Sequence, residues 1–170
     1  MSVHTSLIPS LWFDDQLEEA AAFYCALFPR SEVTWTARYG EAGPGEAGTV
    51  MAGEFVLDGL RFRAINGGPM FHFTEAVSFV VECADQAEVD HYWFGLLADG
   101  GEESQCGWLK DRFGLSWQVT PTRLGELLGD PDPARAQAAT RAMLGMRRIV
   151  VADLEAAADA AAGGAAGGAG

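Results

Sequence analysis

The sequence predicts an α+β protein made of two β-α-β-β-β units in tandem, followed by a C-terminal helical extension. The first observation is a repeated tetrad, Asp-Gln-x-Glu, at residues 15–18 and again at 85–88. The same offset aligns Phe23-Tyr24 with Trp93-Phe94 without a gap. The second observation is that each tetrad follows an extended apolar stretch and precedes a hairpin pattern. Self-similarity at a fixed offset indicates repeated structural units.

The first two elements of each unit are expected to be a strand and a helix. Apolar side chains run together at residues 7–13 and 76–83, where we expect the strands. Asp15 and Asp85 stand just before residues that recur at helical spacing, and each has a Glu three positions later. This pattern is a capping box, in which the Asp accepts a hydrogen bond from an N–H of the first helical turn. Both aspartates are therefore expected to be N-caps.

The β region after each helix is expected to end in a hairpin. In the first copy the chain turns at Asp58-Gly59, a pair that readily adopts the positive φ angles of a two-residue turn. In the second copy residues 111–114 take this place. The expected strands are 32–39, 50–57 and 60–65 in the first copy, and 105–110 and 115–119 in the second.

The chain after Pro121 no longer follows the repeat. Asp132 precedes Pro133, a pair typical of a helix start, and this helix is expected to run to about residue 146. Ala and Gly then dominate the end of the chain, where a disordered tail is expected. The predicted organisation is a tandem domain at 1–121 with units 4–66 and 75–121, a helical extension at 122–158 and a disordered Ala/Gly tail at 159–170.

Composition excludes several classes of function. The formal net charge is −13, which disfavours nucleic-acid binding because that needs clustered Lys and Arg. The three cysteines are odd in number and form no Cys-x-x-Cys motif, so neither a disulfide scaffold nor a zinc knuckle is expected. The N-terminus carries neither a basic segment nor a long apolar run, so we expect no signal peptide and no membrane span. The cytoplasm is the expected location.

Three longer motifs, in this order along the chain, resemble the PhnB-like branch of the vicinal oxygen chelate superfamily, the group of glyoxalases, dioxygenases and bleomycin-resistance proteins. The motifs are LWFDDQLEEAAAFYCALFPRSEV, NGGPMFHFTEAVSFVVEC and QCGWLKDRFGLSWQVTPTRLGELLGDPDPARAQAATRAMLGMRRI. This branch is often labelled 3-demethylubiquinone-9 3-methyltransferase. The resemblance implies glyoxalase-like units that form a cupped mixed sheet, a cavity within paired cups, and a homodimer.

The resemblance also implies four positions for metal ligands. Metal-using relatives place His or Glu on the first and fourth strands of each unit, facing the cavity. The corresponding residues in this sequence are Ile8, Arg63, Ser78 and Gln118. Ile offers no lone pair, Arg is a permanent cation, and Ser and Gln are weak ligands beside His, Cys or carboxylate. We therefore expect no metal of the superfamily type and no cofactor.

Without a metal, the resemblance implies a cavity that binds a small organic molecule. The candidate lining residues are Ser10, Trp12, Arg63, Asn66, Ser78, Cys106 and Gln118. Ser78 and Gln118 would form hydrogen bonds with the ligand, and Arg63 would offset a negative charge or bind a carbonyl group. Cys106 is a candidate reactive thiol, but no neighbour in sequence supplies the base or cation that would activate it, so a buried small side chain is the other interpretation.

Three other functions remain open, and the sequence leaves undecided whether the protein is an enzyme. One is a metal-dependent isomerase, lyase or dioxygenase with unorthodox ligands. A second is methyl transfer to a quinone-like phenol, as the family label says. The glycines at 40–48 argue against a nucleotide-binding turn, because they lie between two expected strands and not between a strand and a helix. A third is a dimeric binding module whose cavity is vestigial.

Overall fold

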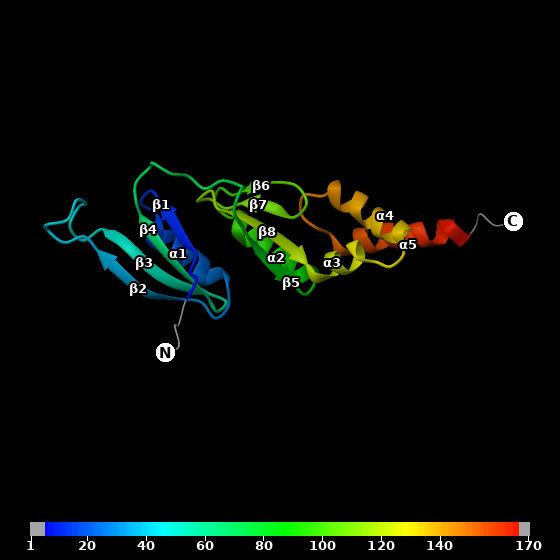
Figure 1. Cartoon of the computed structure of the whole chain (residues 1–170), viewed down its shortest axis with the longest axis horizontal. Helices are drawn as coiled ribbons and strands as arrows, with labels where there is room; N and C mark the ends of the chain where they lie inside the picture. The colour runs from blue at the N-terminus through cyan, green and yellow to red at the C-terminus, as the bar shows by residue number, and fades with distance from the viewer. Residues whose placement is uncertain (1–5, 167–170) are drawn as a thin grey trace. The chain divides into compact units, whose positions relative to one another are not determined.

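The computed structural model describes residues 6–166, and the chain divides into two compact units, Met1–Phe73 and Thr74–Gly170 (Figure 1). The division falls inside the segment that the sequence predicts to join the two repeats, and the start of the predicted unit at residues 4 and 5 lies outside the described residues. Each unit contains one four-stranded mixed sheet, so the predicted α+β class and the repeated β-α-β-β-β order are confirmed.

The first unit has its strands in the order β1-β4-β3-β2. β1 and β4 pair in parallel, and the other neighbours pair antiparallel. The elements are β1 (Ser10–Phe13), α1 (Leu17–Leu27), β2 (Glu32–Arg38), β3 (Val50–Leu57) and β4 (Leu60–Asn66). α1 packs on one face of the sheet, where Tyr24 lies against Phe55, whose ring stacks on that of Phe62. Within residues 6–73 no helix covers the other face. The candidate site described below lies on this open face.

The start of α1 differs from its prediction. The N-cap position is Gln16, not Asp15, and the cap residue's own side chain makes no capping hydrogen bond. Instead the Leu17 N–H donates to Oδ1 of Asn66 over 3.0 Å. Asn66 lies at the end of β4 beside Phe13 of β1, which brings its amide to the helix start. The predicted capping role of Asp15 is wrong because a residue distant in sequence, from the neighbouring strand, takes the role.

The second unit repeats the topology with the order β5-β8-β7-β6. Its elements are β5 (Ser78–Cys83), α2 (Gln86–Leu97), β6 (Glu102–Glu103), β7 (Trp108–Lys110) and β8 (Ser116–Pro121). The capping box predicted for α2 is confirmed, since Asp85 accepts from the Glu88 N–H at 3.0 Å. The Glu88 carboxylate in turn accepts from the Ala84 N–H at 2.7 Å. Trp93 and Leu96 on α2 are fully buried.

The two predicted hairpin turns are present, with different chemistry. Asp58 and Gly59 both have positive φ, 47° and 86°, as a tight two-residue turn requires. In the second unit the buried Asp111 organises the turn. Its Oδ1 accepts the N–H of Phe113 and of Leu115, and its Oδ2 accepts the indole N–H of Trp117 at 2.8 Å.

The strand predicted at 105–110 is shorter in the structure and begins at Trp108. Cys106 and Gly107 both have left-handed φ, 58° and 85°, which breaks the extended conformation. Their N–H groups donate to the carbonyls of Met146 and Arg147. A Cβ on Gly107 would lie 2.8 Å from the carbonyl oxygen of Val119, so only glycine fits there.

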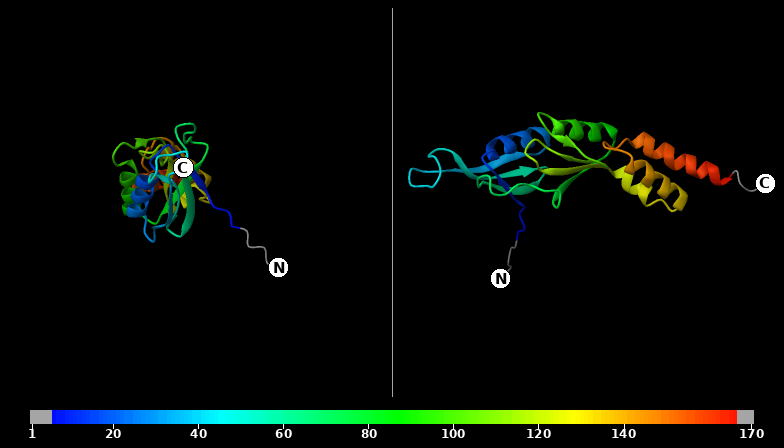
Figure 2. Two further views of the ribbon diagram at one scale, coloured as in Figure 1. Left: turned by 90° about the vertical axis from the view of Figure 1, so that its left-hand side faces the viewer. Right: turned by 90° about the horizontal axis from the view of Figure 1, so that it is seen from above.

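The C-terminal extension packs as part of the second unit (Figure 2). It consists of α3 (Thr122–Leu128), α4 (Pro133–Leu144) and α5 (Val151–Ala166). Asp132 caps α4 as predicted. α3, α4 and α5 enclose a separate core of Leu124, Leu127, Ala139, Ile149, Leu154 and Ala158. Gln86 of α2 ties this core to the sheet, because its Oε1 accepts the Val151 N–H at the start of α5 and its Nε2 donates to the Ile149 carbonyl.

α5 also continues into the segment where a disordered tail is expected from residue 159. Alanine has the highest helix propensity, and Leu154 and Ala158 anchor the preceding turns in the core. Residues 167–170 lie outside the described part of the chain.

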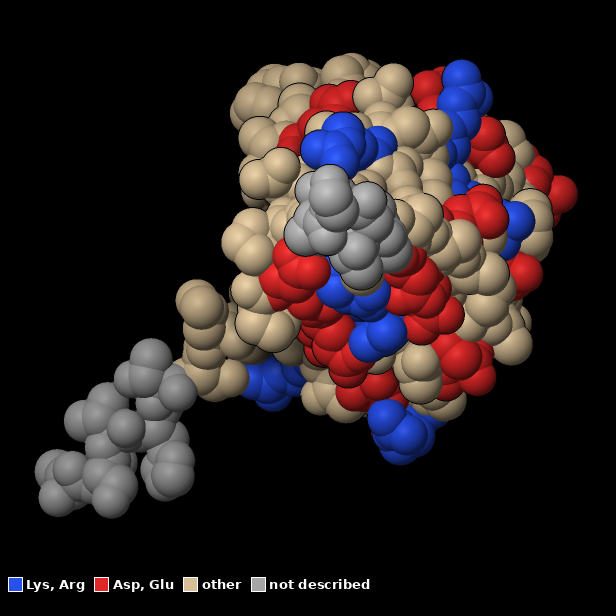
Figure 3. All heavy atoms as spheres, turned by 90° about the vertical axis from the view of Figure 1, so that its right-hand side faces the viewer, with Lys and Arg blue, Asp and Glu red and all other residues tan. Residues whose placement is uncertain are grey.

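Basic and acidic side chains intermingle on the face shown in Figure 3, without a patch of one sign. Among residues 6–166, no helix combines the length and the apolar character needed to cross a membrane.

Candidate functional site

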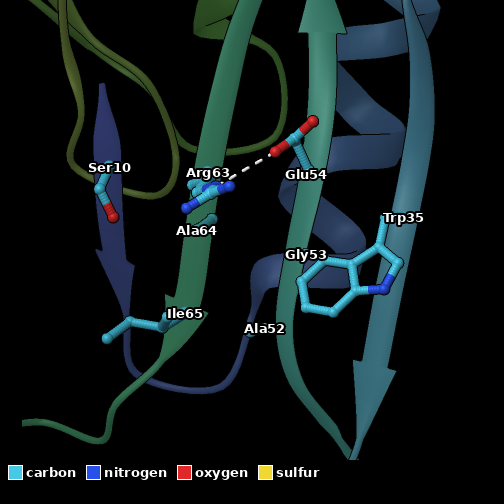
Figure 4. A pocket seen from close by; sticks show the side chains of 8 residues that line it. All are labelled: Ser10, Trp35, Ala52, Gly53, Glu54, Arg63, Ala64 and Ile65. Atoms are coloured by element: carbon cyan, nitrogen blue, oxygen red, sulfur yellow. Dashed lines mark hydrogen bonds and ion pairs between the residues drawn. The ribbon is translucent and has the colours of Figure 1, made fainter. Parts of the chain in front are cut away.

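An open pocket of about 470 Å³ lies on the first sheet (Figure 4). It is lined by Ser10, Trp35, Ala52, Gly53, Glu54, Arg63, Ala64 and Ile65. Side chains alternate along a strand, so Glu54 points away from the face on which its neighbour Phe55 packs against α1. The pocket is therefore built from strands of a single unit and lies on the face without a helix.

Two charged residues form the polar end of the pocket. Glu54 of β3 and Arg63 of β4 are direct partners in the antiparallel register. The Arg63 Nε donates to Oε2 of Glu54 at 3.1 Å, as the dashed line in Figure 4 marks. The Glu54 side chain is only 18% exposed, whereas that of Arg63 is 63% exposed. The carboxylate thus holds one edge of a guanidinium that remains open to the pocket.

Arg61 lies on the other side of the same carboxylate. Its Nη1 is 3.7 Å from Oε1 of Glu54, and its Nη2 donates to Oγ of Ser6 at 3.0 Å. Within residues 6–166, Glu54 is the one residue that forms a hydrogen bond or ion pair with the Arg63 side chain, and the contact is made through Nε. Arg63 is therefore the cation of this cluster that remains available to a ligand.

The rest of the pocket is small or apolar. Trp35 of the edge strand β2 is 53% exposed, and Ile65 of β4 supplies a second apolar side chain. Ala52 lies between these two elements, and its small side chain leaves space above β3, while Gly53 contributes only backbone. Ser10 of β1 is the register partner of Arg63 and adds a hydroxyl near the charged end. Sequence analysis predicted Ser10 and Arg63 but missed Glu54 and Trp35.

The open face of the second sheet brings together the predicted Ser78 and Gln118. Gln118 Nε2 donates to Oγ of Ser78 at 2.8 Å, across the parallel strands β5 and β8. The only lysine in the chain, Lys110, lies on the adjacent strand and pairs with Glu75 at 2.5 Å. Its ammonium donates a hydrogen bond that lowers the pKa of Glu75, and the same contact raises the pKa of Lys110. This face therefore offers neutral hydrogen-bonding groups, with its cation already engaged.

The remaining predicted site residues have structural partners. Trp12 donates its indole N–H to the Gly68 carbonyl at 2.8 Å, and Phe71 packs edge-on against its ring. The Asn66 amide contacts Leu17, as described above, and donates to the carbonyls of Asp15 and Val50. Cys106 lies in the turn before β7 and not on a strand. The side chains of Trp12 and Asn66 thus hold neighbouring segments of the chain against the first sheet. The backbone N–H of Cys106 bonds to the C-terminal extension.

The residues at the four expected ligand positions do not fit a divalent metal. Arg63 is a cation already paired with Glu54, and Ser78 and Gln118 bond to each other as neutral groups. Ile8 has no donor atom. Across residues 6–166, no three His, Cys, Asp or Glu side chains are grouped so that they could hold a metal ion. The donor chemistry is therefore unlike that of a His and carboxylate site.

Comparison with known proteins identifies the family. The model of the family described as 3-demethylubiquinone-9 3-methyltransferase matches residues 5–120. A solved structure from Bacillus cereus, titled a putative 3-demethylubiquinone-9 3-methyltransferase, PhnB protein, is 35% identical. The alignment covers 69% of this chain and 100% of that protein, with a TM-score of 0.64. No curated protein matches the sequence.

More distant solved structures share the fold alone. Protein PA1353 from Pseudomonas aeruginosa is 19% identical over 69% of this chain and 98% of its own, with a TM-score of 0.57. The fosfomycin resistance protein FosX from Listeria monocytogenes is 17% identical over 74% of this chain and 97% of its own, with a TM-score of 0.54. The family match and the likeness to the Bacillus protein together show that this chain belongs to the 3-demethylubiquinone-9 3-methyltransferase family, with the fold of the vicinal oxygen chelate superfamily.

Proposed function

We propose that the protein binds a small organic molecule in the pocket of the first sheet, without a metal ion, and that Arg63 holds an anionic or carbonyl group of the ligand. The observation that carries this proposal is the half-engaged guanidinium of Arg63. Glu54 fixes its Nε edge, and Arg63 lines a pocket with aromatic and aliphatic walls. An apolar concavity with a few oriented polar groups is the usual form of a small-molecule site.

A metal is unnecessary for this role because Arg63 supplies the positive charge that a metal would otherwise supply. The alternative of a metal-assisted enzyme makes a different prediction about the purified protein. Metal analysis of untagged protein after mild purification should find less than one equivalent of any transition metal. A full equivalent that resists dialysis would favour the metal-assisted enzyme.

The proposal is tested by a thermal-shift screen of small carboxylates, carbonyl compounds and neutral aromatics, followed by titration calorimetry of the hits. Arg63→Gln should abolish binding of the hits. Arg38→Gln is the matched control, because Arg38 is also a partly exposed arginine of this sheet that pairs with a glutamate, Glu18, but it does not line the pocket. The screen includes the methyl donor S-adenosylmethionine, since the family description names methyl transfer.

The absence of any Arg63-dependent ligand would count against a binding pocket. Arg63-independent binding of the methyl donor would instead favour the methyltransferase function. A protein that binds nothing at all but forms a stable dimer would fit the dimeric module with a vestigial cavity.

We also propose that the protein is a homodimer. Trp35 and Val80 are both more than half exposed on open sheet faces, and a second copy of the chain could cover such apolar groups. Light scattering of the eluted peak in size-exclusion chromatography should give twice the chain mass. A monomer at micromolar concentration would contradict this assembly.

A further inference from the structure

The polar end of the first-sheet pocket carries a small net positive charge. Two guanidinium groups, of Arg61 and Arg63, flank the single carboxylate of Glu54. The cluster therefore has one positive charge more than it has negative charge, in a chain whose net charge is −13. A ligand with one negative charge neutralises the cluster, and a second negative charge would exceed what the cluster can balance.

The orientation of Arg63 selects the shape of the anionic group. Because its Nε–H bonds to Glu54, the terminal nitrogens Nη1 and Nη2 remain as the free end of a planar fork. Two parallel N–H groups of such a fork match the two oxygens of a carboxylate. The hydroxyl of Ser10, on the strand next to Arg63, can add one further hydrogen bond.

Glu54 places a fixed negative charge beside any anion bound to Arg63. Its side chain is mostly buried, and two arginines hold it in place, so the carboxylate cannot swing away into solvent. Like charges repel more strongly at such a partly desolvated position than in water. A doubly charged phosphonate or phosphate would feel this repulsion about twice as strongly as a singly charged carboxylate, and the cost of removing its hydration shell rises faster with charge than its attraction to the two arginines does.

The opposite side of the pocket suits a flat apolar group. The indole of Trp35 lies beside Ala52, whose side chain is a single methyl group, and beside the backbone of Gly53 (Figure 4). Aromatic rings prefer offset or edge-on contacts with other rings, and the small residues leave room for such a contact. Ile65 closes the apolar side of the pocket.

We infer that the ligand of this pocket is a monoanionic carboxylate with a flat, apolar body, and that Glu54 is the specificity-determining residue that excludes dianions. This inference rests on the proposed small-molecule binding at Arg63 and names its ligand class. Glu54 acts by positioning Arg63 and by repelling a second charge. Glu54 does not occupy any of the four positions at which the resemblance to metal-using relatives predicts a ligand.

Titration calorimetry of the full chain at about pH 8 and constant ionic strength tests the inference with four probes. Benzoate carries one charge, phenylphosphonate carries close to two at this pH, benzamide carries none, and acetate lacks the flat body. Benzoate should bind at least about tenfold more tightly than each of the other three, as expected for a difference of one charge or one stacked ring. Arg63→Gln should reduce benzoate binding to the level of benzamide.

The decisive variant is Glu54→Gln, which keeps the shape of the side chain and removes its charge. It should bring the affinities for benzoate and phenylphosphonate to within about threefold of each other, or reverse their order. Arg61→Gln is the control, because it also removes a charge from the cluster but leaves the contact between Glu54 and Arg63. It should weaken both anions and preserve the preference for benzoate. A ratio of affinities does not depend on the fraction of folded protein, so a partly unfolded variant still gives a valid answer.

An unchanged ratio in Glu54→Gln would overturn the role of Glu54. Phenylphosphonate binding as tightly as benzoate to the unmodified protein would overturn the ligand class, as would Arg63-dependent binding of benzamide without benzoate. In both of these cases the pocket itself would still bind a small molecule. If none of the four probes and none of the screened compounds bound, the proposed function would fail together with this inference.

Discussion

Gln118 and Ser78 are joined across two parallel strands by a hydrogen bond of 2.8 Å from Nε2 to Oγ. From the resemblance to metal-using relatives, a metal ligand is expected at each of these positions. In this chain the two side chains bond to each other, so the amide and the hydroxyl stabilise the strand pair and leave the Gln118 carbonyl, its second amide N–H and the Ser78 O–H proton for a ligand. Both residues are half-buried, and this sets the expected strength of their interaction.

The Gln118–Ser78 hydrogen bond should be measurable as a coupling energy. We expect the variants Gln118→Ala and Ser78→Ala, combined in a double-mutant cycle, to show a coupling of about 0.5–1.5 kcal/mol in the free energy of unfolding. Urea denaturation followed by tryptophan fluorescence provides the measurement. Additive effects within about 0.3 kcal/mol would mean that the hydrogen bond does not persist in solution.

Asn66 should behave as a structural residue. Its side chain accepts from Leu17 and donates to Asp15 and Val50, so Asn66→Ala leaves three backbone groups without their partner. We expect a loss of about 1–3 kcal/mol in the free energy of unfolding. Asn66→Asp keeps the acceptor for Leu17 but lacks both donors, and its loss should be intermediate. A stability unchanged by Asn66→Ala would show that the side chain is available for ligands instead.

Gly67 and Gly125 should respond to alanine in opposite directions. A Cβ on Gly67 would overlap the indole ring of Trp12, so Gly67→Ala must displace the segment that carries Gly68 and Phe71. The variant should lower the melting temperature and shift the tryptophan emission to longer wavelength. Gly125 is exposed within α3, and nothing lies within 4 Å of an added Cβ.

Gly125→Ala should therefore raise stability by about 0.5–1 kcal/mol, because alanine is the better helix former. A destabilising Gly125→Ala would contradict the helical, exposed placement of this residue. A neutral Gly67→Ala would contradict the close approach to Trp12.

Cys83 should resist thiol reagents in the folded protein. Burial, reinforced by the nearby carboxylates of Glu88 and Asp85, raises its pKa to about 12. A raised pKa keeps the thiol protonated, and the reactive thiolate forms only as the pH approaches that value. At about pH 8, labelling with a disulfide reagent should leave Cys83 unmodified until urea unfolds the chain. Peptide mapping identifies the site, and rapid labelling of native Cys83 would refute the buried environment.

Gln86 should couple α2 to the C-terminal helices. Gln86→Ala removes the acceptor for the Val151 N–H and the donor to the Ile149 carbonyl, and should cost about 1–2 kcal/mol of stability. Gln137→Ala is the matched control, since Gln137 is exposed on α4 and the substitution should be neutral or slightly stabilising. Equal effects of the two variants would mean that the contact does not anchor α5.

Most of the fold was predictable from the sequence because the signals that specify it are local. The Asp85 cap, the Asp132 cap and the Asp58-Gly59 turn all depend on residues within three positions of one another, and all three are present in the structure. The cap at Asp15 failed because Asn66, distant in sequence, takes the role. The strand expected from residue 105 failed because pairing with Met146 and Arg147 fixes the preceding turn in a left-handed conformation.

The candidate site likewise combines residues that could be predicted from the sequence with contacts that could not. Ser78 and Gln118 were predicted from the resemblance to metal-using relatives, and the structure brings them together. Glu54 was missed although counting outward from the Asp58-Gly59 turn pairs it with Arg63. Trp12 was placed correctly on its strand, but its hydrogen bond to Gly68 depends on the path of a connecting segment that no periodic pattern describes. The pairing of Glu54 with Arg63 therefore follows from the register of the hairpin, whereas the contact of Trp12 does not follow from any local pattern.

The different caps of α1 and α2 have a consequence for synthesis on the ribosome. The Leu17 N–H donates to Asn66, which is translated 49 residues later. The Glu88 N–H donates to Asp85, which lies only three residues before it in the sequence. The first helix therefore gains its N-terminal partner only after nearly the whole of its unit has been translated. The second can be stabilised as soon as it leaves the exit tunnel. Although the repeat relates these two helices, nascent-chain experiments should find them protected at very different chain lengths.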